Sequence, residues 1–179
     1  MEVSSHWVPA SGALIDPLLP PDDGMDAFRD RPPNLILLSN RHHLRHAERF
    51  ADELDCKIEC SKPGLHEFDG RADVEGFEFG TEVAPGIEAL EVGAICPDES
   101  ALLIGDARAL VIADGIVRYG GEMRFVPDQL LGDDPESVKA GLRDAYSRLL
   151  DRDFDNLLFA HGDPLIGGGK QALREFVEM

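Results

Sequence analysis

The 179-residue sequence has few basic residues and contains no long apolar run. Its 17 Lys and Arg residues stand against 35 Asp and Glu residues, which gives a formal net charge of −18 at pH 7. A field of that sign repels nucleic acid and anionic lipid, so neither is expected as a partner. No stretch approaches the roughly 20 apolar residues that a membrane-spanning helix needs. The acidic charge does not identify a binding partner, because a need for solubility or a salty cytoplasm would explain it equally well.

Cysteine is also scarce, with an odd count of three. The spacing of Cys56, Cys60 and Cys96 fits neither a zinc ribbon nor a disulfide framework. Cys56 and Cys60 share one face of a predicted strand about 13 Å apart, which is too far for a disulfide bond. The N-terminus lacks the basic and apolar segments of a signal peptide. We therefore expect buried, reduced thiols and a cytoplasmic location.

Two common catalytic devices are missing. The segment Gly167–Lys170 invites comparison with a phosphate-binding loop, but Pro164 stands where the first glycine should be. Gln171 follows the lysine, where that loop requires Ser or Thr. Ser39 has no evident base to activate it as a nucleophile. A nucleotide-binding loop and a serine or cysteine hydrolase are therefore not expected.

The hydrophobic pattern predicts a domain of mixed α and β structure. The length and the 43% hydrophobic content suit a single domain over residues 1–179. Amphipathic or capped segments predict helices over residues 44–54, from 133 to about 150, and from just after Gly167-Gly168-Gly169 to the C-terminus. Residues 77–126 are almost all strand and turn. Short apolar runs predict strands at Ala13–Ile15, Leu35–Leu38, Lys57–Cys60, Ile87–Val92, Ala101–Ile104, Ala109–Ala113 and Leu157–Ala160.

Five short motifs occur in an order that resembles the metallo-β-lactamase-fold hydrolases. An early strand ends in Asp16, and the segment from Leu35 to Arg45 stands where that family carries H-x-H-x-D-H. Pro85-Gly86-Ile87 replaces the family's P-G-H, and a later strand pair ends in Asp114. The segment Leu157–Asp163 resembles the late strand that ends in histidine-glycine. The resemblance covers the chain from about Gly12 onward and implies a four-layer αββα sandwich, with two mixed sheets, outer helices and shortened N-terminal strands.

The resemblance also implies a metal site that has lost most of its ligands. Carried over position by position, seven family ligands fall on Asn40, His42, Leu44, Arg45, Ile87, Asp114 and His161. Only His42, Asp114 and His161 retain a metal-binding side chain. Leu44 and Ile87 offer no donor atom, and the guanidinium of Arg45 cannot lose its proton. A dinuclear zinc site is therefore not expected.

Two metal states remain open. Either the site holds no metal, or His42, Asp114 and His161 hold one divalent ion such as zinc, manganese or iron, with His43 or His46 as a fourth ligand. Asn40 could still supply a neutral oxygen. Asp16 is expected to be structural or to lie just outside the ligand set. Arg45 could pair with Asp114 or Asp163 and so replace the missing cation.

Three functions follow from these alternatives. We favour a protein with a degenerate metal site that binds a small molecule or a partner in the old cleft. The second is a single-metal hydrolase of an ester, thioester, lactone or phosphoester, with Asp163 or Asp16 accepting a proton and Arg45 stabilising an oxyanion. The third is a structural or assembly protein, which predicts a stable oligomer. The sequence does not indicate the oligomeric state.

Overall fold

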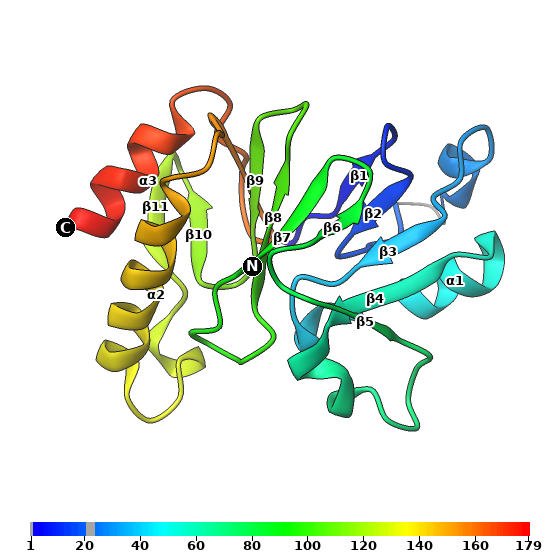
Figure 1. Ribbon diagram of the computed structural model, residues 1–179, viewed down its shortest axis with the longest axis horizontal. Coiled ribbons are helices and arrows are strands. Elements are labelled where there is room, and N and C mark those ends of the chain that lie inside the picture. Colours follow the sequence, from blue (N-terminus) through cyan, green and yellow to red (C-terminus); the bar gives the residue numbers. More distant parts are fainter. Residues whose placement is uncertain (1, 21–23) are drawn as a thin grey trace.

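The computed structural model describes residues 2–20 and 24–179, which form two β-sheets between outer helices (Figure 1). The first sheet has the order β1-β2-β3-β4-β5. Its strands β2 to β5 are parallel, and β1 pairs antiparallel with β2. These strands are β1 (His6–Val8), β2 (Ala13–Ile15), β3 (Leu35–Leu37), β4 (Lys57–Ser61) and β5 (Glu75–Phe77).

The second sheet has the order β12-β9-β8-β7-β6. Only β12 and β9 pair in parallel, and the other neighbours are antiparallel. A separate antiparallel hairpin, β10-β11, lies beside this sheet in Figure 1. The strands are β6 (Glu82–Ala84), β7 (Ile87–Glu91), β8 (Ser100–Ile104), β9 (Ala109–Ile112), β10 (Ile116–Tyr119), β11 (Glu122–Phe125) and β12 (Asn156–Phe159).

The helices cover the two outer faces of this sandwich. Helix α1 (Ala47–Leu54) lies outside the first sheet, and helices α2 (Pro135–Leu149) and α3 (Gly169–Glu178) lie outside the second (Figure 1). The α2 helix begins with the proline and acidic residue that suit a helix start, and the side chain of Asp134 accepts a hydrogen bond from Ser137 N. The described residues also form short 3-10 helices, namely η2 (Met25–Phe28), η3 (Arg41–His43), η4 (Lys62–Glu67) and η5 (Asp128–Leu130).

Strand residues alternate between two apolar layers, as the pleat of a strand dictates. In β9, Ala109 and Val111 pack between the two sheets, whereas Leu110 and Ile112 pack toward α2 and α3. In β2, Ile15 packs between the sheets, and Leu14 packs toward α1 with Phe50. This arrangement buries both faces of each sheet and confirms the predicted αββα layers.

The predicted elements agree with the observed ones to within a few residues. All seven predicted strands are present, and the three predicted helices correspond to α1, α2 and α3. The short strands β1, β5 and β6 and the hairpin β10-β11 were not predicted individually. All three cysteines are buried and free, as expected. None of the helices in the described part of the chain has the length and hydrophobicity needed to cross a bilayer.

Candidate metal centre

The candidate site lies where four strands end. Asp16 follows β2, Asn40 lies three residues after β3, and Asp114 and His161 each lie two residues after β9 and β12. Strands β2 and β3 run parallel, as do β9 and β12, so each pair delivers its carboxyl-end loops to one edge of its sheet. Two loops from each sheet therefore meet at one end of the sandwich.

Two histidines face one carboxylate at this end. His43 Nε2 lies 3.1 Å from Asp114 Oδ1, and His161 Nε2 lies 2.9 Å from the same oxygen. The two imidazole rings meet edge to face, with their centroids 5.9 Å apart. One potential ligand atom from each of the three residues lies within 4.8 Å of the others. These are the separations that two imidazoles and a carboxylate need in order to converge on a single ion.

The other nitrogen of each ring is already occupied. His43 Nδ1 lies 2.9 Å from Asp16 Oδ2 and 2.8 Å from Ser39 Oγ, and Ser39 donates its hydroxyl proton to Asp16. His161 Nδ1 lies 3.2 Å from the main-chain oxygen of Glu2. Both Nε2 atoms therefore face Asp114. In that position each Nε2 can donate a proton in a hydrogen bond to the carboxylate or, without that proton, bind a metal ion beside it.

The charges of the cluster shift its pKa values in opposite directions. Burial alone would lower the pKa of His43, but the charge of Asp16 and the hydrogen bond to Asp114 raise it to about 9. Burial would raise the pKa of Asp114, yet hydrogen bonds from His161 and His43 hold it well below its usual range. Complete burial would raise the pKa of Asp16, but the charges of His43 and Arg45 and the hydrogen bonds with His43 and Ser39 together lower it. Both carboxylates are therefore ionised at neutral pH and attract a cation.

The structure brings His43, rather than His42, to Asp114 and His161. The side chain of Asn40 caps η3 by accepting a hydrogen bond from His42 N, and its Nδ2 donates to Asp114 Oδ2 at 2.8 Å. The chain therefore turns after β3, and neighbouring side chains of a 3-10 helix point in different directions. His43 is consequently buried, whereas His42 is exposed and lines the pocket beside the cluster. Asn40 is a residue type that commonly caps a helix, so it is the feature of the sequence that could have indicated a turn beginning there, with His43 three residues later.

Arg45 lies in the same pocket, as its position in the motif suggested. It does not pair with Asp163, and its Nη1 instead donates to the main-chain oxygens of Ser4 and Asp16 at 2.7 and 2.9 Å. Burial lowers the pKa of Arg45, while the charges of Asp16 and Asp114 act in the opposite direction. Its Nη2 is buried and has no hydrogen-bond partner among the described residues.

The other expected residues lie outside the cluster. Asp163 is exposed and absent from the pocket lining, with its main-chain N–H bonded to Arg118 O. Leu44 packs with the α1 side of the core, and Ile87 is buried between the sheets. His46 is exposed, and its Nδ1 accepts a hydrogen bond from Leu19 N. No step that needs Asp163 in the pocket is supported by this arrangement.

The cluster forms one wall of a pocket of about 550 Å³. This volume lies within the range typical of small-molecule sites. The polar lining comes from the histidines, Arg45 and Asp114. The rest is apolar, and it is formed by Val3, Leu18, Ile95, Val126 and Leu130.

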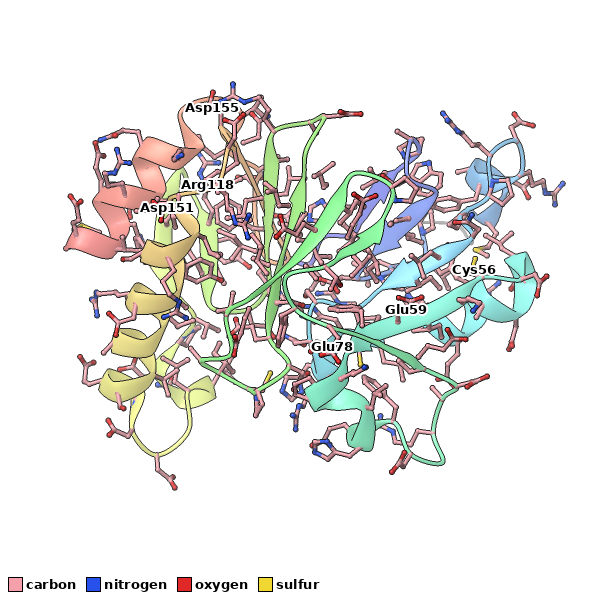
Figure 2. All side chains as sticks on the ribbon, viewed as in Figure 1. Cys56, Glu59, Glu78, Arg118, Asp151 and Asp155 are labelled. Carbon is pink, nitrogen blue, oxygen red and sulfur yellow. The ribbon has the colours of Figure 1, made fainter. Side chains whose placement is uncertain are left out.

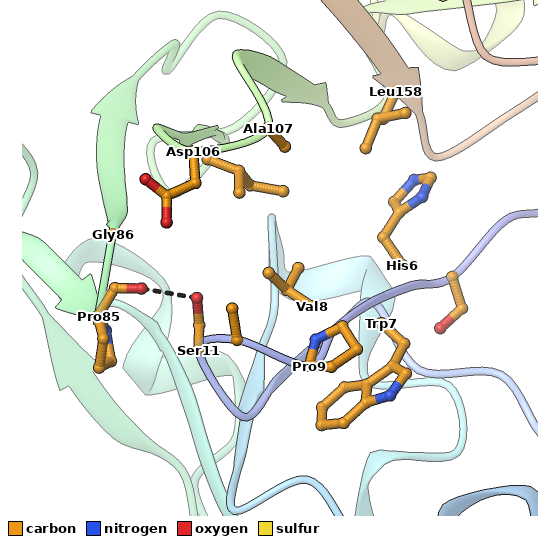
Figure 3. A pocket seen from close by; sticks show the side chains of 13 residues that line it. His6, Trp7, Val8, Pro9, Ser11, Pro85, Gly86, Asp106, Ala107 and Leu158 are labelled. Carbon is orange, nitrogen blue, oxygen red and sulfur yellow. Dashed lines mark hydrogen bonds between the residues drawn. The ribbon is translucent and has the colours of Figure 1, made fainter. Parts of the chain in front are cut away.

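A second cavity has a volume of about 410 Å³, and Figure 3 shows the side chains that line it. It is lined by residues that precede strands β2, β7 and β9, among them Ser11, Gly86 and Asp106. Figure 3 shows the hydrogen bond that the Ser11 hydroxyl donates to Pro85 O, which is 2.6 Å long. The second cavity therefore lies near the starts of these strands, whereas the cluster of His43, Asp114 and His161 lies after strand ends.

The donor set fits one divalent ion. His43, Asp114 and His161 provide three protein ligands of the types that zinc, manganese and iron accept. Asp16 holds His43 in the required orientation, as an outer carboxylate does in many metal sites. Within residues 2–20 and 24–179, no second group of three His, Cys, Asp or Glu side chains is close enough to hold another ion.

No protein-family model matches the chain, and no curated protein matches it in sequence. Solved structures do match. TTHA1623, crystallised in a di-iron-bound form, is 21% identical with a TM-score of 0.72 over 94% of this chain and 91% of that one. A metallo-β-lactamase from Pontibacter korlensis is 14% identical with a TM-score of 0.65 over 93% and 80%. The archaeal metallo-β-lactamase superfamily protein ST1585 from Sulfolobus tokodaii is 12% identical with a TM-score of 0.63 over 93% and 74%.

The chain therefore has the metallo-β-lactamase fold. The identities of 12–21% make it a divergent example, as the incomplete sequence motif had suggested. The likeness covers more than nine-tenths of this chain in each comparison, so it extends through both sheets and their helices.

Proposed function

We propose that this protein binds one divalent metal ion through His43, Asp114 and His161 and uses the adjoining pocket to bind a small molecule. The observation that carries the proposal is the approach of two imidazole Nε2 atoms to a single oxygen of Asp114. The di-iron-bound form of TTHA1623 gives a precedent for metal in this fold. One such group of potential ligands is found among the described residues, which supports a site reduced to a single ion.

A bound divalent ion acts as a Lewis acid and lowers the pKa of a coordinated water. The protein's own residues perform the other tasks. Asp16 and Ser39 fix the ring of His43, and Asn40 fixes the carboxylate of Asp114. The apolar wall of the pocket excludes water from a bound molecule, which strengthens its contacts with the polar wall.

The test is metal analysis of protein purified without chelator, followed by titration calorimetry with Zn²⁺ and Mn²⁺. We expect about one equivalent of bound metal, and its loss in His43→Ala and His161→Ala. The matched control is His42→Ala, which removes an exposed imidazole one residue away from His43 and should leave the stoichiometry unchanged.

Two results would contradict the proposal. Wild-type protein that carries no metal and gains no thermal stability from added zinc, manganese or iron would show that the cluster is held by protons alone. Loss of metal in His42→Ala but not in His43→Ala would return the ligand role to His42, as the motif alignment predicted.

A single-metal hydrolase of an ester, thioester, lactone or phosphoester is the second candidate. The observation in its favour is Arg45, whose guanidinium lines the same pocket and could stabilise a developing oxyanion. The same variants decide the question with p-nitrophenyl ester and phosphoester substrates. Turnover by metal-loaded wild type that disappears in His161→Ala supports this candidate, and equal background rates reject it.

A further inference from the structure

The pocket beside the metal cluster contains an arginine held in an unusual conformation. Arg45 follows η3 with a φ of +42°, in the left-handed region that residues other than glycine rarely adopt. Such strain persists where the surrounding structure enforces it, and it concentrates at ligand sites. Two main-chain carbonyls hold Nη1 of Arg45 in place, so the guanidinium is fixed before any ligand arrives.

The hydrogen-bonding capacity of this guanidinium is incompletely used. Arg45 Nη2 is buried and has no hydrogen-bond partner among the residues that the structure describes. A buried donor without a partner is costly, and a charged donor more so. An oxyanion is the natural partner of a guanidinium, since it can accept two parallel hydrogen bonds.

The pocket also differs in charge from the rest of this acidic protein. Arg45 is the permanent positive charge of its lining, and Asp114 is the one carboxylate among the lining residues described. Asp114 is engaged by Asn40 and by two imidazoles. A chain with a net charge of −18 repels anions in general, so an anion that enters here must be drawn by local groups.

The apolar side chains of the lining indicate the chemistry of the rest of the ligand. Val3, Ile95, Val126 and Leu130 line the pocket, and Leu130 leaves 58% of its surface exposed. An exposed leucine at the rim of a concave apolar surface offers contact area to a bound hydrocarbon. The combined walls therefore suit a molecule with an anionic end and an apolar end.

We propose that the pocket binds an amphiphilic organic oxyanion, a carboxylate or a phosphate ester with a hydrocarbon chain, and that Arg45 recognises its anionic group. This inference rests on the proposed use of the pocket for a small molecule, and it names the class of that molecule. Arg45 is here a binding residue for the anion, and the hydrocarbon lies along the apolar wall formed by Ile95, Val126 and Leu130.

The experiment is titration calorimetry with hexanoate, hexyl phosphate and uncharged 1-hexanol, on protein as purified and after EDTA treatment. We expect saturable binding of at least one anion and at least about tenfold weaker binding of hexanol. The preferred anion then distinguishes a carboxylate from a phosphate. Arg45→Gln should weaken anion binding about tenfold or more. Arg174→Gln, which removes an exposed arginine from α3, should have no effect.

Leu130→Asp provides a second test at a position where folding is not at risk, because the side chain is mostly exposed. A carboxylate at the rim should weaken hexanoate binding several-fold through like-charge repulsion. Equal affinity for hexanol and hexanoate, equal effects of Arg45→Gln and Arg174→Gln, or no saturable binding of any probe would overturn the inference. Metal analysis of Arg45→Gln separates the two proposals, because that variant keeps His43, Asp114 and His161.

Discussion

At the scale of single residues, the site depends on which histidine of an adjacent pair turns inward. His42 and His43 differ only in their direction from η3, yet one is exposed and the other is buried against two carboxylates. Asn40 decides between them, because capping η3 fixes where the turn begins. A residue that looks like a weakened metal ligand in sequence therefore acts as the cap that orients His43, a candidate ligand.

Glu99 is a second buried residue with a measurable consequence. Its carboxylate oxygens accept hydrogen bonds from Ile95 N and Gly115 N, at 3.1 and 3.0 Å, beneath the loop that carries Asp114. Burial raises the pKa of Glu99 to about 7 from an ordinary value of 4.5. The folded protein therefore holds this proton in a pH range where the unfolded chain has lost it.

We predict that this difference makes stability fall as pH rises from 4.5 to 7. The stabilisation by protonated Glu99 is fully present below the pKa of the unfolded chain, 4.5. It is lost as the pH rises through the folded pKa of about 7, which lowers the free energy of unfolding by on the order of 3 kcal/mol. Urea unfolding between pH 4.5 and 7.5 should show a shallower decline in Glu99→Gln than in wild type. The exposed Glu78→Gln is the control, and parallel curves for wild type and Glu99→Gln would refute this role.

At the scale of elements, the loop after β12 positions His161 through a contact with β10. Arg118 N donates to His161 O, and Asp163 N donates to Arg118 O. Gly162 lies between these two bonds with a φ of +99°, and a Cβ there would overlap the Arg118 carbonyl. Only glycine allows the two backbones to approach this closely.

Gly162→Ala should therefore destabilise the protein by about 3 kcal/mol or more, because backbone strain and a steric clash add together. Gly167→Ala is the matched control, since Gly167 also has a positive φ but has open space where a Cβ would lie. It should cost only about 1–2 kcal/mol. Chemical denaturation measures both variants, and equal losses would mean that the contact with Arg118 is not tight.

At the scale of the whole molecule, net charge governs the response to salt. Charged side chains project outward from both halves of the sandwich, and the labelled Glu78 and Asp151 are among the exposed acids (Figure 2). With a net charge of −18, repulsion among these groups opposes compaction. Salt shortens the range of that repulsion from about 10 Å at 0.1 M to about 3 Å at 1 M.

We predict that the melting temperature at pH 7 rises by on the order of 5 °C between 0.1 and 1 M KCl. The effect should nearly vanish at pH 4.5, which is close to the sequence pI of about 4.5. Differential scanning calorimetry at both pH values checks this prediction. An equal rise at pH 4.5 would attribute the effect to stronger apolar burial instead of screening.

The sequence predicted the layers of this fold better than it predicted the site. Short apolar runs such as Ala109–Ile112 and amphipathic helices such as α1 reveal in their own sequence which side chains are buried, so their types follow from local patterns. The convergence of Asp114 and His161 followed from their places after matching strands. The choice of His43 did not, because it depends on an unseen turn at Asn40 and on the buried carboxylate of Asp16, which lies far away in sequence. Partners that lie far apart in sequence become visible only in the folded structure.

The contact between Arg118 and the loop of His161 also ties two walls of the pocket together. One end of the hairpin β10-β11 holds the His161 backbone, and its other end leads directly into Val126 of the apolar wall. A molecule bound against that wall would therefore lie next to the hairpin that also holds the backbone of His161. Linkage then runs both ways. If a metal ion and a small molecule both bind here, whatever factor the metal imposes on affinity for the small molecule is imposed in return on affinity for the metal.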